Sequence, residues 1–251
     1  MPFANNQGVR IYYETVGQGR PLFLHHGTSG SGPDWADLGY VDALKSDHRL
    51  ILVDARGHGL SDKPYDPAAY DLSLRASDVV SVLDDLDLRK ADYFGYSMGG
   101  WIGFGLAKHA PARVNSFVIG AAHPYAESMK PRRDFFAPKN RDAFAAAVDQ
   151  LFGARLTPAM RERFLQNDLE ALHVLTQDRV SIAEVLPSMR MPCLLYVGEL
   201  DTRLAEVKEC AAALPDATLF TVPGCDHIAT PTRLDVIVPQ VQSFLSKRGA
   251  A

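Results

Sequence analysis

The sequence predicts an α/β protein built on a mostly parallel, twisted β-sheet with helices on both faces. Apolar segments of strand length alternate with segments whose apolar residues recur at helical spacing, and this alternation is typical of parallel sheets. The segment 49–54 is a continuous apolar run, as expected for a strand buried on both faces. The chain has 251 residues, the length of one large domain of this class.

The expected strands are short runs rich in apolar, β-branched and aromatic residues, bounded by glycine or polar turn residues. They cover residues 9–16, 21–26, 49–54, a run that ends at Tyr96, 115–119, 192–197 and 217–222. Helices are expected where apolar residues recur every three or four positions. They cover residues 40–46, 74–88, a run from the end of that strand to about His109, 204–213 and 234–247.

Residues 121–191 interrupt this alternation, because they contain no convincing strand. Helical patterns occur instead at 142–152, 158–166 and 169–177. Asn167 or Asp168 would cap the last of these helices. A helical insertion between two strands would lie over the strand ends, so we expect a small lid. The expected organisation is a core of residues 1–122 and 192–251 with a lid of residues 123–191.

Composition narrows the class of protein. Hydrophobic residues make up 47% of the chain, charged residues 22%, and the net charge is −4, which is ordinary for a soluble globular protein. The sequence contains no apolar run of about 18 residues for a membrane span, and we expect neither a basic face for nucleic acid nor a signal peptide. Three cysteines without a C-x-x-C motif suggest reduced thiols. We therefore expect a cytoplasmic protein with neither nucleic acid nor membrane as a partner.

The stretch around Ser97 carries the strongest chemical signal. Gly95 to Gly99 reads Gly-Tyr-Ser-Met-Gly, preceded by an apolar run and followed by a helix-compatible run. This strand, turn and helix are the context of a nucleophile elbow, in which a strained backbone lifts the serine hydroxyl clear of the sheet. Small neighbours are needed there, and glycines supply them.

A base and an acid are found at two further strand ends. Ligands bind at the carboxyl ends of parallel strands. Ser97, Asp201 and His227 each follow one predicted strand, in the chain order serine, acid, histidine. Glu199, on the same turn as Asp201, is the rival acid, and Glu127 is a remote one. Three such residues in this order predict nucleophilic catalysis.

With these motifs, the chain resembles the α/β-hydrolase superfamily, in particular its single-domain serine esterases and lactonases, such as 3-oxoadipate enol-lactonase-like enzymes. The matching segments are residues 26–28, 54–62, 95–100, 198–201 and 224–227. The resemblance implies the α/β-hydrolase fold and favours Asp201 over Glu199 as the acid. It also implies an oxyanion hole made by the backbone amides of Thr28 and Met98.

Other residues have two readings each. His123 and Trp101 are candidate substrate contacts, although core packing suits Trp101 better. A basic run at the start of the lid is either a solvated face or a rim that attracts carboxylate substrates. It comprises Lys130, Arg132, Arg133, Lys139 and Arg141. Bracing of the loops near the site is the expected role of His25, His26, Asp54, Arg56 and His58.

The sequence leads to the hypothesis of a serine hydrolase that cleaves a small carboxylic ester or lactone through an acyl-Ser97 intermediate. Neither a cofactor nor a metal is expected, since the histidines are scattered and no dinucleotide or phosphate-loop motif occurs. A carbon–carbon bond hydrolase, a perhydrolase and a triad-retaining receptor remain alternatives. Ile228, rather than an aromatic residue, follows His227, which disfavours the first of these. The expected partner is a small molecule, and the chain would be a monomer or a homodimer.

Overall fold

The computed structural model describes residues 2–137 and 141–247. Its framework is an eight-stranded sheet with the order β1-β2-β4-β3-β5-β6-β7-β8. The two pairings that involve β2 are antiparallel, and the strands from β4 to β8 pair in parallel. The predicted mostly parallel sheet is confirmed. The strands are β1 Phe3–Asn6, β2 Val9–Val16, β3 Arg20–His25, β4 His48–Val53, β5 Ala91–Tyr96, β6 Val114–Gly120, β7 Cys193–Gly198 and β8 Ala217–Val222.

β1 is the strand that the sequence did not predict. It forms a hairpin with β2 through Gln7 and Gly8, which both have positive φ. Two successive positive φ angles are the geometry of a tight hairpin turn. The strand is four residues long and ends in two asparagines, so it lacks the apolar pattern that predicts a strand.

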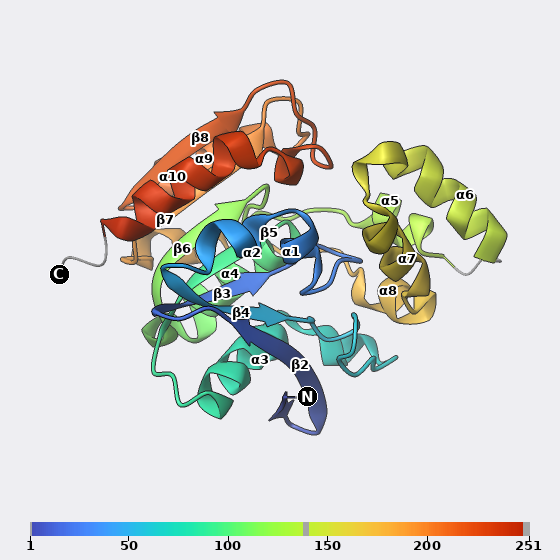
Figure 1. The fold of residues 1–251 in the computed structure, drawn as a ribbon, viewed down its shortest axis with the longest axis horizontal. Coiled ribbons are helices and arrows are strands. Elements are labelled where there is room, and N and C mark those ends of the chain that lie inside the picture. The colour runs from blue at the N-terminus through green and yellow to red at the C-terminus, as the bar shows by residue number, and fades with distance from the viewer. Residues whose placement is uncertain (1, 138–140, 248–251) are drawn as a thin grey trace.

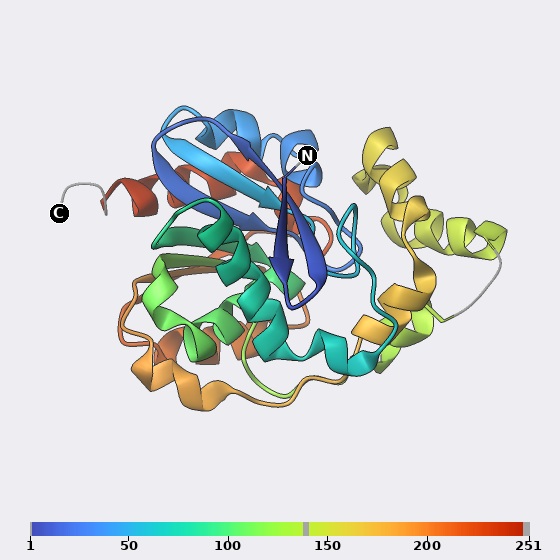
Figure 2. The same ribbon diagram turned by 90° about the horizontal axis from the view of Figure 1, so that it is seen from below.

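Helices cover both faces of the sheet, as predicted (Figure 2). The segments α2 and α10 pack together on one face, while α3, α4 and α9 lie on the other. The helices of this core are α1 Asp34–Asp37, α2 Tyr40–Leu44, α3 Leu72–Asp85, α4 Met98–His109, α9 Leu204–Ala213 and α10 Leu234–Ser246. In the described ranges, no helix combines the length and the hydropathy that a membrane span requires.

A buried ion pair braces the loop after β4. The Arg56 guanidinium donates to both carboxylate oxygens of Asp78 on α3, at 2.5 and 2.6 Å, and Asn6 donates to the same carboxylate at 2.7 Å. Removing one partner of such a buried pair typically costs about 3–5 kcal/mol. Arg56 therefore holds the loop to α3, in agreement with the bracing role expected from the sequence.

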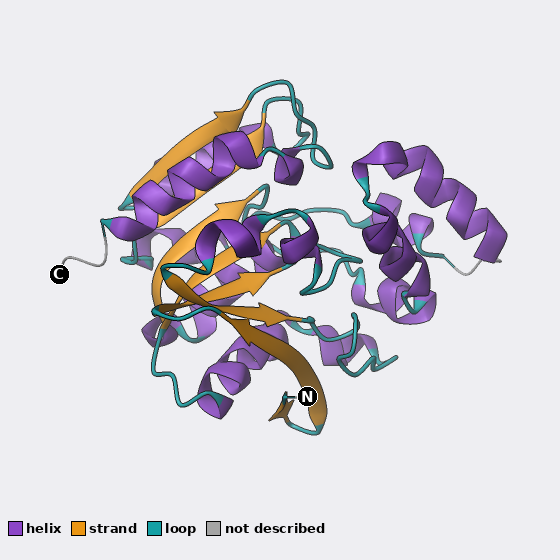
Figure 3. Cartoon of the chain, viewed as in Figure 1, coloured by secondary structure: helices purple, strands orange, loops and turns teal. Residues whose placement is uncertain are grey.

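Among the described residues, four α-helices are inserted between β6 and β7, where the sequence predicted a lid. Figure 1 shows them gathered beyond the tips of β3 and β4, and Figure 3 shows that this part of the molecule is helical. Aromatic rings of Phe144, Phe152 and Phe164 pack together inside it. The first helix was missed because it is short and reads as a basic run. The helices are α5 Lys130–Phe135, α6 Arg141–Phe152, α7 Pro158–Gln166 and α8 Leu169–Leu175.

The ends of this inserted segment meet in a short neck. Glu127 and Arg179 exchange two backbone hydrogen bonds, at 2.9 and 3.1 Å, and their side chains form an ion pair at 2.9 Å. Beyond the neck, the 3-10 helix Ala183–Ser188 contacts α4 and α9 of the core. These residues pack on the core, although the predicted lid extends to residue 191. The lid boundary at residue 191 therefore stays a proposal.

Contacts also tie the inserted helices to the loops at the strand ends. Asn167, 6% exposed, donates to the carbonyl of Ser29 at 2.8 Å. Arg163 pairs with Asp34 at 2.7 Å. Of the two predicted caps, Asp168 is the one that caps α8, because its carboxylate accepts from the amide of Ala171 at 3.0 Å. The inserted helices therefore meet the core at the face where the strand ends lie.

Candidate active site

The turn between β5 and α4 holds Ser97 in a strained conformation. Ser97 has φ 54° and ψ −108°, a backbone geometry that residues other than glycine rarely adopt. A Cβ on Gly95 would collide with the carbonyl oxygen of Gly99, and one on Gly99 with that of His25. The Ser97 amide donates to the carbonyl of Gly120 on β6 at 2.8 Å. The close packing of backbone explains why glycine stands on both sides of the serine.

The three residues that sequence reasoning took from separate strand ends are in contact. His227 Nε2 lies 2.9 Å from Ser97 Oγ, and His227 Nδ1 lies 2.6 Å from Asp201 Oδ2. The Asp201 side chain is fully buried and also accepts from the amide of Arg203 at 3.0 Å. An ionised carboxylate can only accept, so Nδ1 carries a proton and Nε2 is free to accept one from Ser97.

Electrostatics favour a neutral histidine beside an ionised aspartate. Burial lowers the pKa of His227, and the nearby Arg203 charge lowers it further, while the hydrogen bond to Asp201 opposes both. Burial raises the pKa of Asp201, but the hydrogen bond and charge of His227 and the contacts with Arg203 leave it below its ordinary value. At neutral pH the imidazole can therefore accept a proton and the carboxylate stays ionised.

The two rival acids lie elsewhere. Glu199 is exposed, and its carboxylate accepts from the amide of Gly224 at 3.0 Å. Glu127 pairs with Arg179 and Arg203. Neither of them is hydrogen-bonded to His227, whereas Asp201 is.

Two backbone amides are available beside Ser97. Gly27 abuts the serine, since a Cβ on it would lie 3.4 Å from the Cβ of Ser97. The amides of Thr28, next to Gly27, and of Met98, the first residue of α4, donate to no acceptor in the described part of the chain. The Met98 side chain is 1% exposed and belongs to the core. Both amides are thus without an acceptor, on residues that adjoin Gly27 and Ser97, which is compatible with the predicted oxyanion hole.

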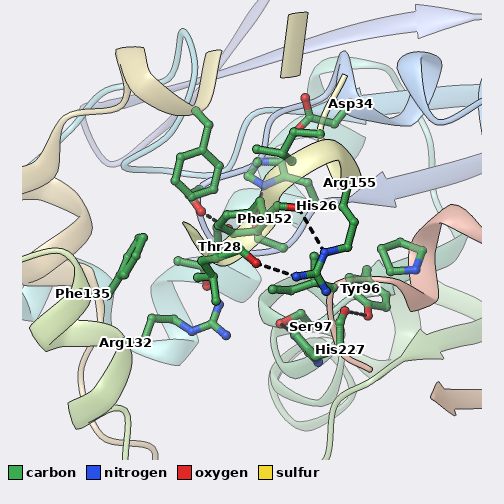
Figure 4. A pocket seen from close by; sticks show the side chains of 18 of the residues that line it. His26, Thr28, Asp34, Tyr96, Ser97, Arg132, Phe135, Phe152, Arg155 and His227 are labelled. Carbon is green, nitrogen blue, oxygen red and sulfur yellow. Dashed lines mark hydrogen bonds between the residues drawn. The ribbon is translucent and has the colours of Figure 1, made fainter. Parts of the chain in front are cut away.

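A cavity of about 700 Å³ opens over Ser97 and His227, between the strand ends and the inserted helices (Figure 4). This volume suits a small molecule of some tens of atoms. Apolar side chains from the inserted helices form much of the wall. They include Met129, Phe135, Phe136, Leu151, Phe152, Leu156, Met160 and Phe164. Sequence reasoning missed these residues, because helical spacing alone does not tell the cavity side from the core side.

His123 and Trp101 are not among the described residues that line this cavity. His123 is 4% exposed, and burial lowers its pKa. Trp101 is 9% exposed, with the Arg179 guanidinium 4.7 Å from the centre of its ring. Both side chains are therefore packed in the protein interior. Because neither lines the cavity, the structure does not support their predicted role as substrate contacts.

An ion-pair network that the sequence did not suggest borders the site. Arg203 Nη1 lies 3.5 Å from His227 Nδ1 and 3.9 Å from Asp201 Oδ1, and its other terminal nitrogen binds Glu127. Glu127 also pairs with Arg179, which stands at the neck of the inserted segment. The network links that neck to the histidine and its acid. No local motif signals it, because Glu127 and Arg203 are 76 residues apart.

Comparison with known proteins identifies the family. A family model described as the alpha/beta hydrolase fold matches residues 20–181, more than half of the chain. The chain belongs to the α/β-hydrolase family, and the predicted fold class is confirmed.

Several relatives cover nearly the whole chain. A putative carbamate hydrolase from Azorhizobium caulinodans is 35% identical over 97% of this chain and 98% of its own length. The structure of an esterase from Rhodococcus sp. ECU1013 superposes with a TM-score of 0.85 at 26% identity, covering 97% of both chains. The enol-lactonase from Burkholderia xenovorans LB400 gives a TM-score of 0.84 at 25% identity, covering 98% of this chain and 100% of that one. These names describe enzymes that hydrolyse different acyl compounds.

Proposed function

We propose that the chain is a serine hydrolase that cleaves a small carboxylic ester or lactone through an acyl-Ser97 intermediate. The observation that carries the proposal is the continuous line of hydrogen bonds from Ser97 through His227 to the buried Asp201. The strained turn beneath Ser97 and the cavity above it support the same reading. Relatives named esterase and enol-lactonase agree with this substrate class.

In the proposed reaction, the Ser97 oxygen attacks the acyl carbon while His227 Nε2 takes the hydroxyl proton. The tetrahedral oxyanion accepts hydrogen bonds from the amides of Thr28 and Met98. As the intermediate collapses, the bond to the leaving alkoxide breaks and His227 returns the proton to that oxygen. The acyl group is now an ester of Ser97; the alcohol of an ester leaves, whereas the hydroxyl formed by opening a lactone stays attached to the acyl group.

Hydrolysis of the acyl-enzyme by water follows the same two steps, attack and collapse. His227 takes a proton from the water as its oxygen attacks the acyl-Ser97 carbonyl, and the second tetrahedral intermediate expels the Ser97 oxygen. The proton passes from His227 to Ser97, and the carboxylic acid leaves. Asp201 keeps the Nδ1 proton in place throughout and stabilises the imidazolium. The inserted helices would act as a lid that limits access of water to the cavity.

The test combines a substrate panel with trapping of the intermediate. The panel holds p-nitrophenyl esters from acetate to decanoate, aliphatic and aryl lactones and one meta-cleavage dienoate, each assayed with and without peroxide. Acid quenching during turnover of p-nitrophenyl acetate should leave an acetyl group on the peptide that contains Ser97, detected by mass spectrometry. A chain that is labelled there but turns over once would be a receptor. Preferred cleavage of the dienoate or peroxide-dependent activity would replace the ester hypothesis with one of its two enzymatic alternatives.

The pH profile of kcat/KM is expected to depend on Arg203. A protonated His227 cannot accept the Ser97 proton, so activity is present above the pKa of His227 and is lost below it. Because Arg203 lowers that pKa, Arg203→Met should move the acid limb to higher pH, and the wild-type limb should lie below about 6.5, the ordinary pKa of histidine. Initial rates between pH 4.5 and 8.5 measure the shift.

Arg161→Met provides the matched control. Arg161 is an arginine of α7 that pairs with the exposed Asp149 at 2.6 Å, away from the cavity lining. Its replacement should leave the acid limb in place. An unchanged limb in Arg203→Met as well would show that Arg203 does not tune His227.

A further inference from the structure

Arg132 is a guanidinium that faces the cavity without a partner. It lies on α5 and lines the cavity wall. Figure 4 shows its side chain extending from this helix toward Thr28 and Ser97. Within residues 2–137 and 141–247 its side chain forms neither a hydrogen bond nor an ion pair, whereas the side chains of Lys130 and Arg133 form both. Its guanidinium is therefore directed into the space above the nucleophile and forms no ion pair with a carboxylate of the described residues.

The other charged groups of the cavity wall are neutralised. Arg155 pairs with Asp226 at 2.9 Å and donates to two backbone carbonyls. Arg203 is held by Glu127. Asp34 is bound by Arg163 from α7. Arg132 is thus the one cation of the described cavity wall that has no ion-pair partner among the described residues.

The surroundings make this charge costly in the empty protein. Burial, together with a smaller effect of the neighbouring Arg203 charge, lowers the pKa of Arg132 to about 10. At neutral pH the guanidinium is still charged. A charge removed from water is stabilised when it pairs with an opposite charge, and a guanidinium matches a planar carboxylate with two parallel hydrogen bonds. The unpaired guanidinium is therefore a ready binding site for an anion.

We propose that Arg132 binds a carboxylate on the part of the substrate that does not react, so that the enzyme prefers esters or lactones of dicarboxylic acids. This inference rests on the proposed function, since the reacting acyl group has to lie at Ser97. One unpaired guanidinium matches one planar carboxylate, whereas a phosphate dianion would keep part of its charge unpaired. Apolar neighbours such as Phe135 and Phe136 would contact the methylene chain between the two carbonyl carbons.

Arg133 is the matched control within the same helix. It follows Arg132 directly but is absent from the described cavity wall, and it binds Asp178 at 3.2 Å and the carbonyl of Thr176 at 3.1 Å. Both arginines can be changed to methionine, which keeps most of the aliphatic length. A variant of Arg133 therefore reports what loss of charge from this helix does in general.

The experiment compares substrates that differ in one charge. The p-nitrophenyl monoesters of succinate, glutarate and adipate are assayed at pH 7.5 beside their neutral methyl-capped counterparts. The wild type should prefer the anionic member of each pair at its best chain length. Arg132→Met should lower kcat/KM for that anionic ester by about 10- to 100-fold, the range for a charge-assisted hydrogen bond, with little change for the neutral one. Arg132→Lys should recover part of the loss, and Arg133→Met should change neither.

Two kinetic results would overturn the inference. One is a wild type that hydrolyses neutral esters through Ser97 and shows no preference for the anionic ones. The other is an equal loss on both substrates in Arg132→Met, which marks a structural role. If no ester is turned over, the proposed function is refuted, but the role of Arg132 can still be tested by measuring ligand binding. Calorimetry with monomethyl adipate and dimethyl adipate on the Ser97→Ala protein should then show tighter binding of the monoanion, abolished by adding Arg132→Met.

Discussion

Replacing Ser97 with alanine is expected to lower kcat for ester hydrolysis by about 10⁴- to 10⁶-fold. The variant lacks the oxygen that forms the acyl-enzyme, so only the oxyanion donors and the bound geometry still favour attack by water. A residual rate above the uncatalysed one is expected for the same reason. Steady-state turnover of the best p-nitrophenyl ester, together with loss of labelling by a fluorophosphonate, measures the effect.

Ser31→Ala controls for the loss of a buried hydroxyl near the site. Ser31 is 6% exposed, and its hydroxyl lies 3.3 Å from Asp34 Oδ1, outside the described cavity wall. Its activity should stay close to the wild type, and both variants should keep the wild-type thermal midpoint. Hydrolysis by Ser97→Ala within tenfold of the wild type would refute an acyl-Ser97 mechanism.

Asp201→Asn is expected to lower kcat by about 10⁴-fold while the protein remains folded. The wild-type carboxylate accepts the Nδ1 proton of His227, which leaves Nε2 free to accept from Ser97. An asparagine amide group can donate to Nδ1 instead, and the imidazole then carries its proton on Nε2. In that tautomer it cannot take the Ser97 proton.

Glu199→Gln separates this role from the general effect of a lost charge on the same turn. Glu199 is exposed and binds the amide of Gly224, a contact that glutamine can keep through its carbonyl oxygen. Its kcat should change little. A large loss in Glu199→Gln with a small one in Asp201→Asn would reverse the assignment of the acid.

The predicted and observed bounds of an element agree best where the segment itself contains the strand or helix periodicity. The segments β2, β8, α7 and α9 begin and end at the residues that the sequence predicted. Each has its strand or helix composition within its own length. Other predicted elements, such as α3, differ from the structure by a few residues at their ends, and the elements that the sequence missed, β1, α1 and α5, are short. The four residues of β1 and the six of α5 are too few to show a strand or helix period. β1 is recognised by its pairing with β2, and α5 by its place in the cavity wall.

The sequence by itself determined the α/β alternation, the glycine-flanked turn at Ser97 and the order of the three residues that meet there. These follow from local periodicity and from the rule that parallel strands end at one edge of a sheet. Other features were decided by the tertiary structure alone: the hydrogen bond of Glu199 to the Gly224 amide instead of to His227, the contact of Glu127 with Arg203, and the orientation of Arg132 toward Ser97. Each depends on which groups distant segments bring within a few ångströms of one another, and no local pattern encodes that distance.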